Sequence, residues 1–126
     1  MKYICLAYED EATINSLTGR QWTELRSETL AYVEDLRRSG RMISAEALQS
    51  VHAAATVRVR NGRTAVTDGP FAETKETLGG FFLIEARDLN EAIQVASHWP
   101  SARLGSIEVR PVEEELRIEG RYEIAG

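Results

Sequence analysis

The chain has 126 residues and a mass of 14.1 kDa, which fits one domain and leaves little room for a second. With 43% hydrophobic and 28% charged residues it has the composition of an ordinary globular protein. Lys and Arg number 15 against 20 Asp and Glu, so the net charge is −5, and direct nucleic-acid binding is not expected because phosphate recognition needs a basic surface.

Cysteine and histidine usage excludes further classes of chemistry. The single cysteine, Cys5, forms no internal disulfide and supplies no thiolate zinc site, and His52 and His98 lack the spacing of a metal pair. No metal or cofactor is therefore expected. No run approaches the roughly 18 apolar residues of a membrane span, and the first residues lack the long apolar core of a signal peptide. We expect a cytoplasmic protein that does not enter a membrane.

The first strand is expected at residues 2–8, which carry apolar side chains on both alternating faces, as in a strand covered on both sides. The polar and small residues 9–19 predict a loop. Thr18 and Gln21 form a candidate capping box for a helix that stops at Gly40. Its apolar positions recur at helical spacing: Trp22, Leu25, Thr29, Tyr32, Val33 and Leu36.

The strongest local signal is the pair Asn61-Gly62 between two alternating runs, which predicts a hairpin of residues 56–60 and 63–67 with a type I′ turn. In this register Arg60 faces Arg63 and Val57 faces Val66. One face of the hairpin is then apolar, the other carries three arginines, and we expect the apolar face to be buried.

The remaining elements are a strand at residues 81–86, a helix capped by Asp88 and Glu91, and a strand at residues 106–112. The helix ends at Pro100, and its apolar stripe is expected to be Leu89, Ala92, Ile93, Ala96 and Trp99. The domain spans residues 1–113. Residues 114–126 are an acidic tail or an extra strand through residues 116–118.

The order strand, helix, strands, helix, strand predicts an α+β fold, a ferredoxin-like sandwich whose antiparallel sheet carries two helices on one face. Several strands are apolar on both faces, yet no third helix is available to cover the second face. A second copy stacked sheet on sheet would bury it, so we expect a homodimer through the open sheet face.

The densest set of reactive groups lies in residues 68–80. Asp68, Glu73 and Glu76 are candidate catalytic acids or bases, because a carboxylate beside another carboxylate or an apolar wall has a raised pKa. Glu73 and Glu76 share a face if the segment forms a helical turn. Candidates for substrate binding are the cations that would hold an anionic group and the residues that shape the loop: Arg58, Lys75, Gly69, Pro70, Phe71 and Gly80.

Each candidate also has a structural interpretation. Asp-Gly-Pro is a good turn, and mixtures of Glu and Lys are usually solvated surface. His52 lies in a linker and His98 closes the second helix, and for both we favour a structural or surface role over catalysis. Cys5 lies in a core strand and is expected to be an inert buried thiol.

The run D-G-P-F-A-E-T-K-E of residues 68–76, followed by Gly79-Gly80-Phe81, resembles the signature of the DGPF branch of the YCII-related family. The resemblance covers roughly residues 1–113 and implies a ferredoxin-like fold that dimerises as an α+β barrel. It includes residues 3–8, 46–48, 56–58, the Gly62 turn, residues 83–85 and residues 105–111.

The resemblance implies little about function. Most members are uncharacterised, and some DGPF-type domains accompany extracytoplasmic-function sigma factors. A related branch includes a dehydrochlorinase, with a suspected catalytic His on the first helix and an Asp. Aligned on Gly40, the His position holds Thr29 and the Asp position falls near His98 or Trp99, so the pair is missing here. Any acid and base must then come from elsewhere, with the loop carboxylates available.

Three hypotheses follow. The first is a cofactor-independent small-molecule enzyme of lyase, isomerase or hydrolase type, in which Asp68 or Glu76 moves a proton in a pocket roofed by Phe71. The second is a non-enzymatic small-molecule-binding or regulatory module associated with sigma-factor control, with the acidic tail from Glu113 as a docking element. The third is architectural: Phe71 plugs the core and every charge of the loop is paired.

Overall fold

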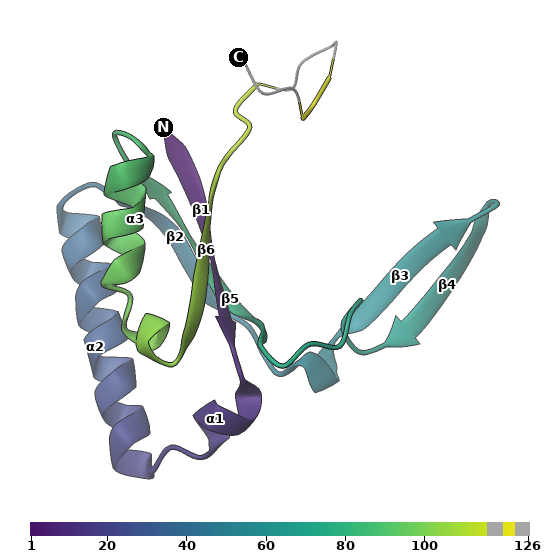
Figure 1. The fold of residues 1–126 in the computed structure, drawn as a ribbon, viewed down its shortest axis with the longest axis horizontal. Coiled ribbons are helices and arrows are strands. Elements are labelled where there is room, and N and C mark those ends of the chain that lie inside the picture. Colours follow the sequence, from purple (N-terminus) through teal and green to yellow (C-terminus); the bar gives the residue numbers. More distant parts are fainter. Residues whose placement is uncertain (116–119, 123–126) are drawn as a thin grey trace.

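The computed structural model describes residues 1–115 and 120–122. In chain order its elements are β1 (Lys2–Glu9), α1 (Glu11–Asn15), α2 (Gly19–Arg38), β2 (Met42–Ala47), the 3₁₀ turn η1 (Val51–Ala53), β3 (Ala55–Arg60), β4 (Arg63–Asp68), β5 (Thr77–Glu85), α3 (Leu89–Ser97), η2 (Pro100–Arg103) and β6 (Gly105–Pro111). An antiparallel sheet in the order β2-β5-β1-β6 carries α2 and α3 on one face (Figure 1). The predicted ferredoxin-like α+β fold is confirmed.

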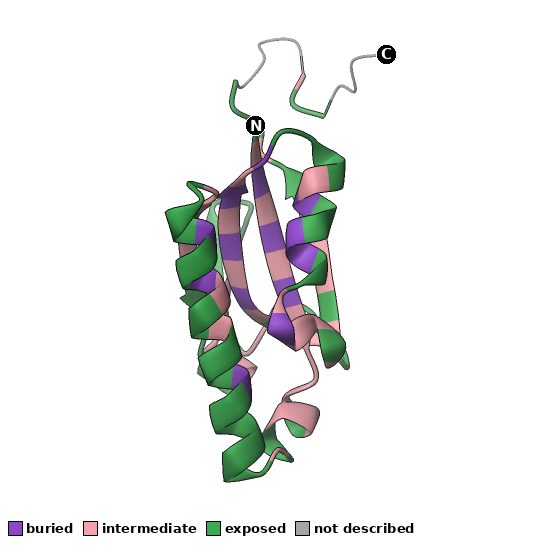
Figure 2. Ribbon diagram, turned by 90° about the vertical axis from the view of Figure 1, so that its left-hand side faces the viewer, coloured by how far each residue is buried: buried purple, intermediate pink, exposed green. Residues whose placement is uncertain are grey.

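The core lies between the sheet and these two helices (Figure 2). Along β1, Tyr3, Cys5 and Ala7 are buried on the helix side, while the residues between them are half-exposed. Phe82 of β5 pairs with Cys5 across the sheet and is fully buried. The Trp99 ring stacks on Phe82 with 4.0 Å between ring centroids, so the end of α3 is fastened to the middle of the sheet.

The opposite face of the sheet has no helix over it in the described part of the chain (Figures 1 and 2). Its apolar side chains are left half-exposed, as the sequence pattern predicts for a face without a cover. They are Ile4, Leu6, Tyr8, Phe81 and Leu83. A homodimer through this face remains a prediction.

The predicted capping box of α2 is present. The Thr18 hydroxyl accepts a hydrogen bond from the Gln21 backbone N–H at 3.1 Å, and the Gln21 side chain accepts one from the Thr18 N–H at 2.9 Å. The chain turns away at Gly40, whose φ of +74° lies in the left-handed region that glycine adopts without strain. The helix buries Leu25, Val33 and Leu36.

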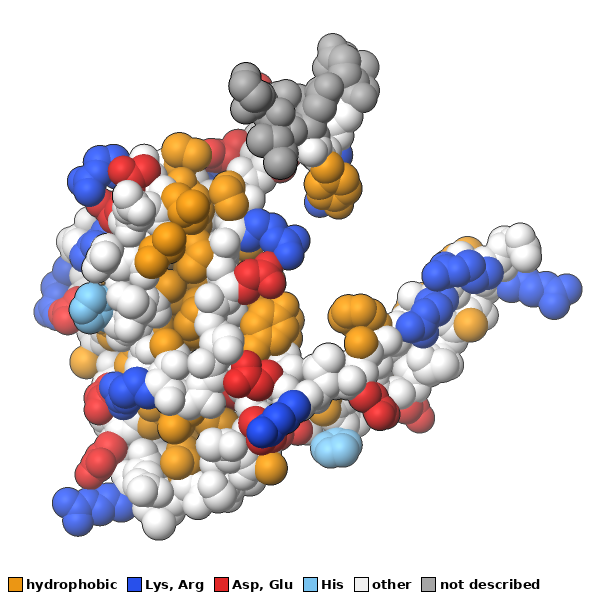
Figure 3. Space-filling view, viewed as in Figure 1, with side chains coloured by type: hydrophobic (Ala, Val, Ile, Leu, Met, Phe, Trp, Pro, Cys, Tyr) orange, Lys and Arg blue, Asp and Glu red, His pale blue; other side chains and the backbone are white. Residues whose placement is uncertain are grey.

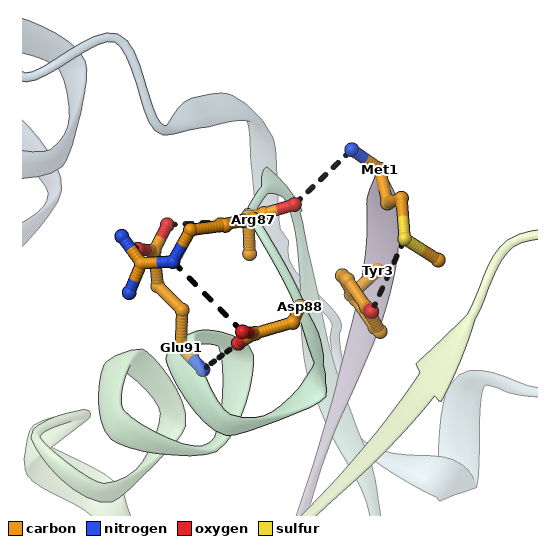
Figure 4. A network of polar contacts seen from close by, with 6 residues as sticks. Met1, Tyr3, Arg87, Asp88 and Glu91 are labelled. Carbon is orange, nitrogen blue, oxygen red and sulfur yellow. Dashed lines mark hydrogen bonds and ion pairs between the residues drawn. The ribbon is translucent and has the colours of Figure 1, made fainter.

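The start of α3 is held by a polar network that also fixes the N-terminus (Figure 4). Asp88 accepts a hydrogen bond from the Glu91 backbone N–H at 2.9 Å, as predicted, but the Glu91 side chain accepts from the Arg87 N–H. The Met1 ammonium donates to the carbonyl oxygen of Ala86 at 3.1 Å.

The predicted apolar stripe of α3 is partly wrong. The helix buries Ala92, Val95 and Ala96, whereas Leu89 and Ile93 stay 46% and 45% exposed. The small side chains face the sheet and let this short helix approach it closely, which leaves the larger pair on the flank.

One α-helix and one strand were not expected from the sequence. The predicted loop 9–19 contains α1, which Asp10 caps by accepting from the Ala12 N–H at 3.1 Å. The strand β2 has weak alternation and lies at the sheet edge, so its pairing with β5 defines it better than its own residues do. Pairing also sets the start of β5. The strand begins at Thr77, four residues before the predicted start, because it pairs with both β1 and β2.

The β3–β4 hairpin, called the arm (residues 55–68), pairs with no other strand that the structure describes and projects from the body (Figures 1 and 3). Its register is the predicted one, and Asn61 and Gly62 have φ values of +52° and +73°. The expected burial of its apolar face is wrong for the single chain, since Val57, Val59 and Val66 are 61%, 56% and 61% exposed. No described element of the body reaches this face.

Residues 113–115 follow β6 without regular structure, and the extra strand considered at residues 116–118 lies outside the described residues. Among the helices the structure describes, none is long and apolar enough to cross a membrane.

We expect Leu36→Ala to lower the free energy of unfolding by about 2–5 kcal/mol, because it empties a fully buried position under α2. Leu89→Ala is the control, since its half-exposed side chain loses fewer contacts, and we expect a cost under about 1 kcal/mol. Urea unfolding at one protein concentration measures both. Equal costs would show that the side of α2 assigned to the core is wrong.

Candidate functional site

The loop of residues 69–76 is fastened to the root of the arm. The backbone N–H of Gly69, whose φ is +99°, donates to the Ala54 carbonyl at 2.7 Å, and the Thr56 hydroxyl donates to the Gly69 carbonyl at 2.8 Å. The Arg58 guanidinium donates to the Phe71 carbonyl at 3.4 Å. The Arg58 side chain therefore contacts the backbone of the loop.

The charged residues of this loop are not brought together. Asp68, Glu73 and Lys75 are exposed and form no ion pair in the described part of the chain, while Glu76 is half-buried and accepts from the Ser106 hydroxyl at 2.8 Å. Residues 69–76 form bends, so the helical turn that would align Glu73 with Glu76 is absent. The catalytic roles of Asp68, Glu73 and Glu76 stay predictions.

Phe71 is 80% exposed, so it does not plug the core of this chain. It borders an open groove of about 820 Å³ between the root of the arm and the body. Pro70, Val57, Tyr8 and Leu78 also line this groove, and no charged side chain does among the described residues. A groove of this composition offers apolar contact but supplies no acid or base.

A second cavity, of about 450 Å³, lies between α2 and the β1–β5–β2 part of the sheet. Space exists here because the sheet carries small residues beneath the helix: Ala7, Ala45, Ala47, Gly79 and Gly80. Trp22 and Trp99 add aromatic walls. Its volume falls in the range of ordinary small-molecule sites.

Four charged residues line this cavity: Glu9, Arg26, Arg37 and Glu46. The two arginines lie on α2 and are exposed, so they can reach an anionic group at the mouth. Thr29 adds a hydroxyl, although the structure uses it to donate to the Leu25 carbonyl at 2.8 Å. The cavity thus combines aromatic walls, two acids and two cations.

Glu9 is the titratable group that the sequence analysis missed. It continues the helix-side series Tyr3, Cys5, Ala7 along β1, and this alternation is the signal that could have found it. Burial raises the pKa of the Glu9 carboxyl above its ordinary value, and the Glu11 carboxylate raises it further. Glu11 is held in place because it accepts from the Ser50 hydroxyl at 3.0 Å and the Val51 N–H at 2.9 Å.

The Glu9 carboxylate lies over Gly79, the extra residue of a bulge where β5 pairs with β1. A Cβ atom at position 79 would overlap Glu9 Oε1, so the carboxylate would have to move. Glycine at this position therefore makes room for Glu9 inside the cavity.

The predicted binding residues are divided between the two cavities. Gly80 lines the cavity beneath α2, and Pro70 and Phe71 line the apolar groove. The remaining predicted residues line neither of these two cavities: Arg58, Asp68, Gly69, Glu73, Lys75 and Glu76.

The other reactive side chains lie elsewhere. His52 is exposed in η1, and His98 caps α3 with its Nδ1 2.8 Å from the Gln94 carbonyl oxygen. Burial raises the pKa of the Cys5 thiol to about 12, which agrees with an inert thiol. Residues 1–115 and 120–122 contain no cluster of His, Cys, Asp and Glu that could hold a metal ion.

The sequence matches the YCII-related domain over residues 1–116. The chain belongs to the YCII-related family. It is 37% identical over 114 residues to an uncharacterised protein of Rhizobium meliloti (strain 1021), a match that covers 89% of this chain and 92% of the relative.

Among solved structures, this YCII-related chain is similar to the 5-chloro-2-hydroxyhydroquinone dehydrochlorinase TftG of Burkholderia phenoliruptrix AC1100, in a complex with 2,5-dihydroxybenzoquinone. The TM-score is 0.54, and the match covers 91% of this chain and 96% of the neighbour. At 14% identity the likeness shows the fold alone.

Two of the residues compared above with the related branch line the cavity beneath α2. Thr29, which stands at the expected His position of the related branch, lines it, and so does Trp99, one of the two residues near the expected Asp position. Neither residue can transfer a proton at neutral pH, so Glu9 is the acidic group of this cavity that burial has perturbed.

We expect Glu9→Gln to stabilise the protein at neutral pH. Because the pKa in the folded state lies above the ordinary 4.5, the folded state binds more protons than the unfolded state between 4.5 and the raised value. The unfolding free energy of the natural protein therefore falls as pH rises through this window. The variant lacks this fall, so its advantage appears above the window and vanishes below about pH 4.

Urea unfolding across about pH 3.5–8 at constant ionic strength measures this difference. Glu34→Gln is the matched control, since it removes the same charge from an exposed position on α2. An advantage of Glu9→Gln that does not change with pH would contradict the burial of an ionised Glu9.

Proposed function

We propose that the chain is a cofactor-independent enzyme that acts on a small organic molecule by proton transfer in the cavity beneath α2. The single observation that carries this proposal is the half-buried Glu9 carboxyl inside a cavity of about 450 Å³. A carboxyl with a raised pKa is a better general acid near neutral pH, and once ionised it is a stronger base. Lyase, isomerase and hydrolase reactions all use this step.

The walls of the cavity favour a planar anionic substrate. Trp22 and Trp99 suit an aromatic or quinonoid ring, and Arg26 and Arg37 suit a carboxylate or phenolate on it. The dehydrochlorinase neighbour was solved with 2,5-dihydroxybenzoquinone, a molecule of this kind, which makes that compound a reasonable first probe.

The loop carboxylates remain the alternative source of the proton. Asp68, Glu73 and Glu76 line neither cavity of a single copy, so a role for them requires a second copy that brings the loop to a substrate. We propose a homodimer through the uncovered sheet face, supported by the half-exposed Ile4 and Leu6 on that face.

Binding is tested first, by titrating 2,5-dihydroxybenzoquinone into ¹⁵N-labelled protein. We expect the amide signals of Gly79 and Gly80 to shift, because both residues line the cavity and contribute only backbone to it. Gly69, at the root of the arm, is the internal control and should not shift. Signal shifts at Gly69 alone would show that the compound binds at the loop and not in the cavity.

Activity is tested on a panel of small phenols, quinones and carboxylic acids without added cofactor, followed by mass spectrometry. We expect Glu9→Gln to lower kcat/KM by about 10²–10⁴-fold on any substrate that is converted, as for loss of a general acid or base. Glu34→Gln should leave it unchanged. A loss on Asp68→Asn or Glu76→Gln instead would assign the proton to the loop and overturn the role of Glu9.

Gly79→Ala tests the position of Glu9 without changing its chemistry. We expect a loss of activity comparable to that of Glu9→Gln with an unchanged circular dichroism spectrum, since the added methyl group displaces the carboxylate. Gly19→Ala is the matched control because a Cβ there meets nothing within 4 Å. Full activity of Gly79→Ala would contradict the assigned geometry.

The regulatory alternative is favoured by one observation, the exposed apolar side chains of the arm, which suit a partner protein. In that case the cavity binds a ligand without converting it. This alternative would be supported if the protein bound a panel member but converted none, and if the bound molecule stayed unconverted in both the natural protein and Glu9→Gln.

A further inference from the structure

The arm is the part of the molecule least supported by the rest of the chain. Its two strands pair with each other and with no strand of the main sheet, and within residues 1–115 and 120–122 only its root is hydrogen-bonded to neighbouring segments. The valine face, formed by Val57, Val59 and Val66, is more than half exposed.

A free two-stranded hairpin is at best marginally stable in water, because one strand pair buries too little apolar area to offset the loss of backbone entropy. Yet this hairpin has a turn sequence that specifies one register, and three valines are collected on one of its faces. These features fit a segment that is ordered against another surface.

The direction of the arm indicates where that surface lies. The arm leaves the body on the side of the sheet opposite α2 and α3, and the concave notch between arm and body is visible in Figure 3. A second copy seated on the uncovered sheet face would lie within the reach of the arm. The apolar groove at the arm root is continuous with that face, since Tyr8 belongs to both.

Charge favours a second copy of this chain over nucleic acid or a basic partner. The arm carries three arginines, Arg58, Arg60 and Arg63, against one acid, Asp68, for a net charge of +2. The whole chain carries −5, so the residues outside the arm carry −7. These opposite net charges attract each arm to the other copy of a two-fold dimer, while the arginines, on the arm face opposite the valines, stay outside the docked face.

We propose that the arm docks on the body of a second copy of this chain, with its valine face against the partner's uncovered sheet side. The proposal rests on the homodimer proposed above and adds the arm to its interface. In this dimer the two exchanged arms hold the two copies together. Each arm, which its own chain does not support, is ordered by the surface of the other copy.

The first experiment measures the dimer dissociation constant by sedimentation for the natural chain and for a variant with Val57→Thr, Val59→Thr and Val66→Thr. Threonine keeps the branched shape and strand preference but adds a hydroxyl to the docked face. We expect the dissociation constant to rise by about tenfold or more. All three positions are exposed in the single chain, so its own folding is little affected.

Ala65→Thr is the matched control, since it adds the same hydroxyl to an exposed position on the arginine face of the arm. Its dissociation constant should stay within about threefold of the natural value. A dimer unaffected by the valine substitutions would overturn the docked arm and leave the homodimer standing. A monomer at every concentration would overturn both.

The second experiment places the arm directly. A nitroxide is attached through Ala65→Cys on an unlabelled copy, which is mixed with ¹⁵N-labelled natural chain, and Cys5 is spared because its buried thiol has a pKa raised to about 12. We expect broadening of the Ile4 and Leu6 amide signals in the natural copy. Broadening confined to the partner's residues 56–67, or no broadening at all, would overturn docking on the body.

Discussion

The structure depends on a sheet that is apolar on both faces while its own helices cover only one. On the helix side, Tyr3, Cys5, Phe82 and Ile84 are sealed from water beneath α2 and α3. On the other side the alternating residues of the same strands stay half-exposed, with nothing from the described chain over them. Burying that face is a strong driving force for association, because its removal from water is favourable in proportion to its apolar area.

Small residues beneath α2 turn the same helix–sheet contact from a packed core into a cavity. Where β1 carries Tyr3 and Cys5 the layers meet closely, and where it carries Ala7 and then Glu9 they do not, because β5 supplies Gly79 and Gly80 opposite. The missing side chains leave room for a ligand and for one carboxylate. Burial of that carboxylate raises its pKa, and the same desolvation lowers the stability of the fold.

Charge is distributed unevenly in a way that composition conceals. The arm is net positive and the rest of the chain is net negative, although the total of −5 is unremarkable for its size. Arg58 joins the arm to the loop of residues 69–76 by donating to the Phe71 carbonyl. The loop thus has a clear structural role whether or not its carboxylates react.

Local sequence determined the features that depend on neighbouring residues. Thr18 with Gln21 caps α2, Asn61-Gly62 sets the hairpin register, and the order of elements gives the ferredoxin-like fold. Only the tertiary structure decided the rest. The edge strand β2 is defined by pairing with β5, the valine face of the arm finds no cover, and Glu9 meets Gly79 across the sheet from 70 residues away. Such contacts join distant segments, and no local periodicity records them.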